Sequence, residues 1–228
     1  MVLGVDVGAT KTAYVLWSGQ KIKKYIKLET SLQNLKKIFY EYRSFKIGVG
    51  LPGAIDYQKA KINCPNIRIF DNINLRKLFP KGTLFDNDVN CFLRAEARLG
   101  AGKGGNNIIG LTFGTGIGGG IMVNGKLYQG KNGAAAEFGH IILDHGRSWE
   151  KIYQTTKNQP VKQKQYNSQG LASVINIFNP EAIIIGGGAR VNYNSKIIKR
   201  LIMVPMPKIK KARLGEKAGA IGAALMVA

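Results

Sequence analysis

Two stretches of this chain share one arrangement: a strand-length apolar run, a turn of glycine and hydroxyl residues, and a second strand. Residues 108–123 read IIGLTFGTGIGGGIMV, and residues 2–17 read VLGVDVGATKTAYVLW. A turn without Cβ atoms lets backbone N–H groups and threonine hydroxyls converge on an anion. A single turn of this kind is more simply a flexible loop. The weak repeat instead predicts two half-domains whose phosphate-binding turns face each other across one cleft.

The charge of the chain is unusual. Lysine and arginine number 34 against 13 acidic residues, a formal net charge of +21. One interpretation is a polyanionic partner, whether nucleic acid, polyphosphate or an anionic membrane surface. The other is a lysine-rich, solvated surface. The basic groups are short and no aromatic residues interleave with them as in a strand-stacking groove, which favours the solvated surface.

Several classes of protein are excluded. No stretch approaches the roughly 20 apolar residues of a membrane span. Met1 leads directly into a strand-like run without a basic segment, so no signal peptide is expected. Cys64 and Cys91 are too few for a disulfide framework or a structural zinc site. These features predict a cytoplasmic, reduced protein.

The N-terminal hairpin carries a charged pair at its turn. Asp6 precedes the turn, and Thr10 and Lys11 follow Gly8 within it. A carboxylate beside a phosphate pocket commonly holds Mg²⁺ through its oxygens or through water. The alternative is an ordinary β-hairpin with an aspartate at its end.

Three further side chains have the chemistry to act on a substrate hydroxyl. Asp88 follows the strand-like residues 83–85 and precedes a predicted helix over 89–99. This location at a strand end suits a general base, although position alone favours a helix N-cap. Glu137 and His140 stand three residues apart. They could form half of a metal site, but no Cys or His cluster follows, so contact with substrate hydroxyls is more economical.

The rest of the chain alternates helices and strands. Ser31 is a predicted N-cap for a helix over 32–42, and residues 182–185 are a buried-type strand that ends in Gly186-Gly187-Gly188, a third phosphate- or nucleotide-facing turn. Residues 144–165 look polar and irregular, apart from a helix-like stretch over 149–153 that contains Glu150, and a helix over 171–178 follows. Small residues over 215–225 predict a helix that can pack closely.

Together these residues resemble the ROK family (repressor, open reading frame, kinase) of the sugar-kinase, Hsp70 and actin superfamily. Seven segments match in the family's order: DVGATK (6–11), GLPG (50–53), PN (65–66), NDVN (87–90), TFGTGIGGG (112–120), EFGH (137–140) and NPEAIIIGGG (179–188). The resemblance implies an α/β protein with the actin-like ATPase (ribonuclease H-like) fold, two α/β domains around a central cleft. The expected N-terminal domain is 1–105, completed by a C-terminal helix over 216–228. The expected C-terminal domain is 106–215, with a trimmed helical insertion.

The resemblance also implies an activity: ATP-dependent phosphorylation of a hexose, glucose or similar, to hexose 6-phosphate, as hexokinases and glucokinases do in glycolysis. Asp88 would be the catalytic base, and Asp6 would hold Mg²⁺ directly or through water. The implied sugar-binding residues are Gly53, Asn66, Asn87, Glu137, His140 and Glu150. The implied ATP- and phosphate-binding residues are Gly8, Thr10, Lys11, Gly114, Thr115, Gly116, Gly187 and Gly188.

This chain departs from the family in two places. The segment between Lys151 and Gln169 is much shorter than the family's helical insertion, which bears on the sugar pocket and on the usual dimer surface, and the zinc motif also differs. ROK proteins usually carry a zinc site of histidine and a cysteine-rich motif, whereas His145-Gly-Arg-Ser-Trp-Glu150 contains no cysteine, so no zinc is expected. N-acetylmannosamine, N-acetylglucosamine and fructose remain open as substrates, polyphosphate as donor, and a homodimer as assembly. A sugar-responsive DNA-binding regulator is the alternative function. Such regulators carry an N-terminal helix-turn-helix, whereas this chain begins at the phosphate strand.

Overall fold

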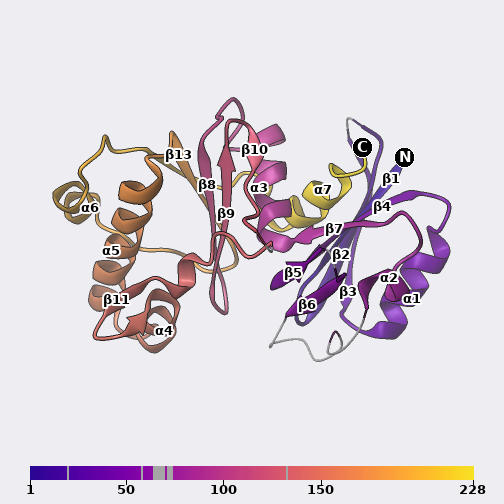
Figure 1. Ribbon diagram of the computed structural model, residues 1–228, viewed down its shortest axis with the longest axis horizontal. Helices are drawn as coiled ribbons and strands as arrows, with labels where there is room; N and C mark the ends of the chain where they lie inside the picture. Colours follow the sequence, from indigo (N-terminus) through magenta and orange to yellow (C-terminus); the bar gives the residue numbers. More distant parts are fainter. Residues whose placement is uncertain (20, 58, 64–69, 71–73, 132) are drawn as a thin grey trace.

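The chain forms two five-stranded sheets with two helices between them (Figure 1). The computed structural model describes all residues except 20, 58, 64–69, 71–73 and 132. The first sheet has the order β3 (Ile22–Glu29), β2 (Lys11–Trp17), β1 (Val2–Val7), β4 (Lys46–Leu51), β7 (Leu84–Asn87). The second has the order β10 (Lys126–Leu127), β9 (Ile117–Val123), β8 (Ile108–Phe113), β13 (Ala182–Gly186), β14 (Lys208–Lys211).

The two sheets repeat one topology. Strand β1 pairs antiparallel with β2 and parallel with β4, and β8 pairs antiparallel with β9 and parallel with β13. The register aligns Asp6 with Gly50 in the first sheet and Thr112 with Gly186 in the second. Each glycine hairpin therefore begins beside the end of a parallel strand, which is where ligands bind in open α/β sheets. The predicted internal repeat is present in the fold.

The helices form layers around the sheets. Helices α3 (Asp88–Leu99) and α7 (Ala218–Ala224) lie between the sheets (Figure 1). Helices α1 (Leu32–Glu41) and α2 (Leu75–Leu78) lie beyond the first sheet, and α4 (Trp149–Thr155), α5 (Pro160–Phe178) and α6 (Ser195–Leu201) beyond the second. Short elements complete the chain: β5 (Ala54–Asp56), β6 (Lys61–Asn63), β11 (Ile142–Asp144), β12 (Arg147–Ser148) and the 3-10 turns η2 (Phe138–His140) and η3 (Gly215–Lys217).

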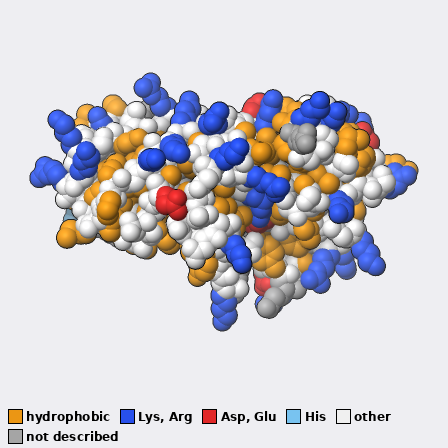
Figure 2. Space-filling model, turned by 90° about the horizontal axis from the view of Figure 1, so that it is seen from above, with side chains coloured by type: hydrophobic (Ala, Val, Ile, Leu, Met, Phe, Trp, Pro, Cys, Tyr) orange, Lys and Arg blue, Asp and Glu red, His pale blue; other side chains and the backbone are white. Residues whose placement is uncertain are grey.

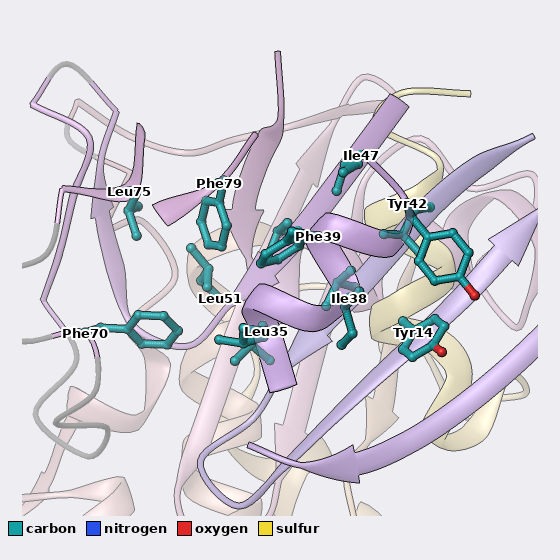
Figure 3. Packing of buried hydrophobic residues seen from close by; sticks show 14 of the residues in the cluster. Tyr14, Leu35, Ile38, Phe39, Tyr42, Ile47, Leu51, Phe70, Leu75 and Phe79 are labelled. Atoms are coloured by element: carbon teal, nitrogen blue, oxygen red, sulfur yellow. The ribbon is translucent and has the colours of Figure 1, made fainter. Parts of the chain in front are cut away.

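Helix α1 shows how local sequence and packing agree. The Ser31 side chain accepts a hydrogen bond from the Asn34 backbone N–H, which confirms the predicted N-cap. Leu35, Ile38 and Phe39 lie on one face of the helix and are buried against the first sheet (Figure 3). The apolar stripe thus sets which face of α1 covers β1 and β4.

Helix α7 approaches its neighbours closely because glycines stand at the contacts. A Cβ on Gly48 of β4 would lie 1.9 Å from the Ala223 carbonyl oxygen. A Cβ on Gly222 would lie 1.7 Å from the Cys91 carbonyl oxygen of α3. The predicted close-packing helix is confirmed, although its first turn is the 3-10 turn η3 rather than α-helix.

The helix-like stretch predicted over 149–153 is confirmed as part of α4, but the prediction that the rest of 144–165 is irregular was wrong. Residues 144–165 contain β12, α4 and the first turns of α5, which begins with Pro160. These first turns are largely exposed, so they have no apolar stripe to reveal them. Their continuation is buried: a Cβ on Gly170 would lie 2.3 Å from the Trp149 ring.

The predicted division into residues 1–105 with 216–228, and 106–215, remains our proposal for the folding units. Each part carries one five-stranded and one two-stranded sheet among the described residues, and α7 returns to the first part. Within the described ranges, no helix has the length and apolar character needed to cross a membrane.

Candidate active site

A cleft of about 970 Å³, here called the central cleft, opens between the two sheets. One wall comes from the first sheet, through Asp6 on β1 and Lys11 on β2. The other comes from the end of β13 and from β14 with the segment after it. Its lining residues include Asp6, Lys11, Lys27, Phe92, Gly186, Gly187, Gly188, Arg190, Tyr193, Lys210, Lys211 and Glu216.

The first predicted phosphate turn borders this cleft. The Gly8 N–H donates to the Lys11 carbonyl oxygen at 3.0 Å, and the Thr30 hydroxyl donates to the Gly8 carbonyl oxygen at 2.8 Å. Asp6 and Lys11 line the cleft, whereas Gly8 and Thr10 belong to the turn outside its lining. Of the four residues predicted around this turn, Asp6 and Lys11 therefore bring a carboxylate and an ammonium to the central cleft.

The second and third predicted turns lie against each other. The Ala189 N–H donates to the Phe113 carbonyl oxygen at 3.1 Å. Gly187 has φ of +94°, and a Cβ there would lie 2.1 Å from the same oxygen. Gly187 and Gly188 line the central cleft, while Gly114, Thr115 and Gly116 follow directly after Phe113 outside the lining. Only glycine allows the third turn to reach this position.

Glu150 supports the second turn from behind. Its Oε2 accepts a hydrogen bond from the Ile117 N–H at 2.7 Å. A Cβ on Gly116 would lie 2.0 Å from that same oxygen. The sugar contact of Glu150 remains a prediction. Its contact with the glycine turn is an additional role that the sequence position of Glu150 did not indicate.

Asn87, and not Asp88, is the N-cap of α3. The Asn87 Oδ1 accepts the Val89 N–H at 2.8 Å and the Asn90 N–H at 3.3 Å. Asp88 is the first helical residue, and its Oδ1 also accepts the Val89 N–H at 2.8 Å. The N-cap interpretation of Asp88 was wrong. The Asn87 Nδ2 donates to the Gly53 carbonyl oxygen at 3.0 Å, which joins two predicted sugar-binding residues.

Burial perturbs both aspartates. It raises the pKa of Asp88 to about 6; the Val89 backbone hydrogen bond opposes this rise, and the charge of Glu137 adds to it. Burial also raises the pKa of Asp6 to about 7, with the charge of Asp88 as a further cause. The two carboxylates and Glu137 therefore lie near enough to interact, although they come from both halves of the chain. A carboxylate whose pKa lies near neutrality suits proton transfer.

Glu137 and His140 lie at the edge of this group. The His140 Nε2 is 3.9 Å from a Glu137 carboxylate oxygen, and the side chains are 71% and 52% exposed, respectively. Both remain open to a ligand. The sixth predicted sugar-binding residue, Asn66, lies outside the described residues.

The donor set at Asp6 fits Mg²⁺. Among the described residues, no group of three or more His, Cys, Asp or Glu side chains could form a complete metal cage. Mg²⁺ commonly takes one or two carboxylates, with substrate phosphates and water as its other ligands. Asp6 offers one such carboxylate in the central cleft, and no described side chain or backbone group donates a hydrogen bond to it.

The residues around His145, where the sequence predicts that no zinc is bound, do not fit a zinc site. Asp144 forms an ion pair with Arg147 and accepts the Tyr166 hydroxyl at 2.9 Å, and His145 is the one imidazole there. This donor set lacks the thiolates of a structural zinc site. The absence of zinc stays a prediction.

Sequence reasoning missed several cations of the cleft. Lys27 forms an ion pair with Glu216 at 2.6 Å, and the Lys210 Nζ donates to the Ala101 carbonyl oxygen at 2.9 Å. Arg190 and Lys211 have no ion-pair partner among the described residues. The lysine group at 208–211 was visible as charge, but only the crossing of β14 brings it to the cleft.

The chain is similar in sequence and in structure to known sugar kinases. The N-acetyl-D-glucosamine kinase of Mannheimia succiniciproducens is 23% identical over 300 residues, covering 99% of each chain. The ROK hexokinase structure from Thermus thermophilus has a TM-score of 0.80 and 25% identity, covering 99% of this chain and 97% of that one. A ROK glucokinase structure from Streptomyces griseus, in complex with glucose and AMPPNP, has a TM-score of 0.78 and 25% identity, covering 99% and 98%.

The repeated sheets, the two glycine hairpins and the central cleft define an actin-like ATPase fold, as predicted from the sequence. A family model described as the ROK family matches residues 2–159. The chain belongs to the ROK family.

Proposed function

We propose that this chain is an ATP-dependent sugar kinase in which Asp88 is the catalytic base. The observation that carries the proposal is the Asp6 carboxylate in the lining of the central cleft, with Asp88 near enough to act on it; burial raises the pKa of Asp88 to about 6 and that of Asp6 to about 7. A base whose pKa lies just below neutral is ionised at working pH and still accepts a proton in the transition state. Its nearness to the charge of Glu137, an exposed residue, supports a sugar site beside it.

In this proposal the Asp88 carboxylate accepts the proton of a sugar hydroxyl while the hydroxyl oxygen forms a bond to the γ-phosphorus of ATP. The bond between that phosphorus and the bridging oxygen breaks, so ADP leaves and a sugar phosphate remains. Lys11 and the Gly187–Gly188 turn bind phosphate oxygens in the cleft. Phosphoryl transfer depends mainly on positioning and charge neutralisation, which these residues supply.

The proposed substrate is glucose or a similar hexose, phosphorylated at its primary hydroxyl. Relatives named N-acetyl-D-glucosamine kinase align over nearly the whole chain, which supports N-acetylglucosamine as the first alternative. Asn87, Glu137 and His140 carry donors and acceptors that suit the hydroxyls shared by these sugars.

The test is direct detection of sugar phosphate. Purified protein with ATP and Mg²⁺ is given glucose, N-acetylglucosamine, N-acetylmannosamine, mannose and fructose in separate assays. Turnover on one sugar supports the kinase and identifies its substrate. Absence of turnover on every sugar, from a folded sample that binds ATP, overturns the proposed reaction.

Activity should depend on pH through Asp88. Because the base must be ionised, kcat/KM is expected to rise with pH along an acid limb with an apparent pKa near 6. Burial of Asp88 is the main reason that this limb lies above the ordinary aspartate range, and the negative charge of Glu137 adds to the rise. A limb near the ordinary pKa of about 4 would contradict the role of a buried Asp88.

The dependence of the rate on Mg²⁺ should reflect the raised pKa of Asp6. Mg²⁺ at Asp6 would neutralise charge that develops on the phosphates. Metal binding requires the ionised carboxylate, so the Mg²⁺ concentration for half-maximal rate is expected to fall as pH rises through about 7. EDTA should abolish turnover, and Asp6→Asn should raise the Mg²⁺ requirement. An unchanged requirement in that variant would remove Asp6 from the metal site.

Polyphosphate is a second candidate donor. Lys11, Lys27, Arg190, Lys210 and Lys211 line the central cleft against two carboxylates, and an excess of cations attracts a chain of phosphates. Lysine and arginine are otherwise spread in small groups over the face seen in Figure 2. Replacing ATP by polyphosphate in the same assay distinguishes the donors.

A further inference from the structure

A buried carboxylate stands directly before the proposed base and is not used by the reaction. Asp86 ends the buried part of β7 and is 1% exposed. Its Oδ2 accepts the Arg94 guanidinium at 2.5 Å, and its Oδ1 accepts the Tyr57 hydroxyl and the Asn90 side-chain amide, each at 2.8 Å. The Asn87 N–H also donates to Oδ1 at 2.8 Å. Asp86 thus holds the residue that caps α3 and precedes Asp88.

One further donor comes from the other half of the chain. The Gln129 Nε2 lies 3.1 Å from the Asp86 Oδ1 and 3.0 Å from the Tyr57 hydroxyl oxygen. Gln129 follows β10, the edge strand of the second sheet, whereas Asp86 and Tyr57 belong to the first half. This amide therefore connects the two halves of the chain at Asp86, two residues before Asp88, the proposed base.

A second contact holds the loop between β10 and Glu137 against the first half of the chain. Gly133 has φ of +74°, and a Cβ there would lie 2.4 Å from the Ile55 carbonyl oxygen and 2.5 Å from the Tyr57 ring. The Ala135 N–H donates to the Gln129 carbonyl oxygen at 3.2 Å, which closes the loop on itself. The loop thus rests on the first half and leads, two residues after Ala135, to Glu137.

We infer that Gln129 is a positioning residue: its amide fastens the loop that carries Glu137 and His140 to Asp86 and Tyr57, and so sets the distance between these sugar-side residues and Asp88. The inference rests on the proposed sugar-kinase function for its catalytic consequence. A hollow of about 450 Å³, lined by Tyr57, Asp86, Arg94 and Gln129 among others, lies beside the contact. Without the Gln129 amide, the Asp86 Oδ1 still accepts hydrogen bonds from Tyr57, Asn87 and Asn90, so the carboxylate is not left unsatisfied.

The test compares Gln129→Ala with Gln163→Ala. The control removes an amide that donates to the Tyr153 carbonyl oxygen at 3.4 Å, far along the chain in α5. Loss of Gln129, whose amide binds a charged group, is expected to raise the KM for sugar about 10-fold or more, while the KM for ATP stays within twofold. The acid limb of the pH profile should also move toward lower pH, because Glu137 is released from Asp88. Gln163→Ala should change none of these.

A double-mutant cycle keeps the test independent of overall destabilisation. Tyr57→Phe retains the ring and removes the hydroxyl that Gln129 contacts. If the contact acts as one unit, Tyr57→Phe adds less than twofold to the sugar KM in the Gln129→Ala background. Full, independent effects of the two changes would overturn the inference.

Hydrogen exchange separates failure of this inference from failure of the proposed function. Peptides containing Gln129 or Glu137 should exchange at least about threefold faster in Gln129→Ala than in Gln163→Ala, without any sugar or ATP present. Equal exchange together with an unchanged sugar KM overturns the positioning role. If the wild type phosphorylates no sugar, the proposed function fails, and the exchange comparison alone decides whether Gln129 holds the loop.

Discussion

Replacing Asp88 by asparagine is expected to lower kcat by about 10²–10⁴-fold, the usual contribution of a general base. Asparagine keeps the size of the side chain and the Asn87 cap, so α3 should begin at the same place. It cannot accept the sugar proton. Turnover measured by direct detection of sugar phosphate, in wild type and variant at pH 7.5, checks the effect. Undiminished turnover would show that Asp88 is not the base.

The same substitution should stabilise the protein. The folded-state pKa of Asp88 is raised to about 6, whereas aspartate in the unfolded chain has a pKa of about 4. Between these two pH values the folded protein holds a proton that the unfolded chain has released. This contribution to stability is complete below the unfolded pKa and is lost as pH rises through the folded pKa. Asparagine avoids that loss, so the melting temperature of Asp88→Asn should exceed that of wild type at pH 7.5, with a smaller difference at pH 5.

Asp144→Asn provides a control of opposite sign. Hydrogen bonds from Arg147 and Tyr166 lower the pKa of Asp144, so its ionised form stabilises the folded protein above the unfolded pKa and that contribution is lost on acidification. The variant should melt below wild type at pH 7.5. Shifts of the same sign in both variants would show that at least one of the two carboxylates lacks the environment described.

Replacing Gly222 by alanine is expected to destabilise the protein by about 3 kcal/mol or more, toward the upper end of overpacking costs. The new Cβ would lie 1.7 Å from the Cys91 carbonyl oxygen and 2.4 Å from the carbonyl carbon. Both are backbone atoms of α3, which cannot rotate away as a side chain can. Alanine favours a helix over glycine by about 1 kcal/mol, but the overlap outweighs this gain.

Thermal unfolding measures the result. For a chain of this size, about 3 kcal/mol corresponds to a fall of about 6–12 °C in melting temperature. Gly188→Ala is the matched control for stability, because nothing lies within 4 Å of its Cβ position. Its melting temperature should stay within about 2 °C of wild type. A stable Gly222→Ala would mean that α7 does not pack on α3 as closely as described.

The sequence by itself determined the features whose cause is local. Glycine and threonine between two apolar runs favour a tight hairpin, and Ser31 caps α1 through its own neighbour Asn34. Seven such local segments in one order were sufficient to predict the family and the fold before any contact was known. The first turns of α5 were not predicted, because their exposed polar residues leave no periodic apolar pattern in the sequence.

Only the tertiary structure decided which side chains meet. Asn87 rather than Asp88 caps α3, because the backbone turn and not the residue type selects the capping side chain. Lys211 reaches the central cleft because β14 pairs beside β13. Gln129 reaches Asp86 across 43 residues of sequence. Such contacts depend on how two sheets and the helices between them pack, and that packing is set by the whole chain rather than by any segment.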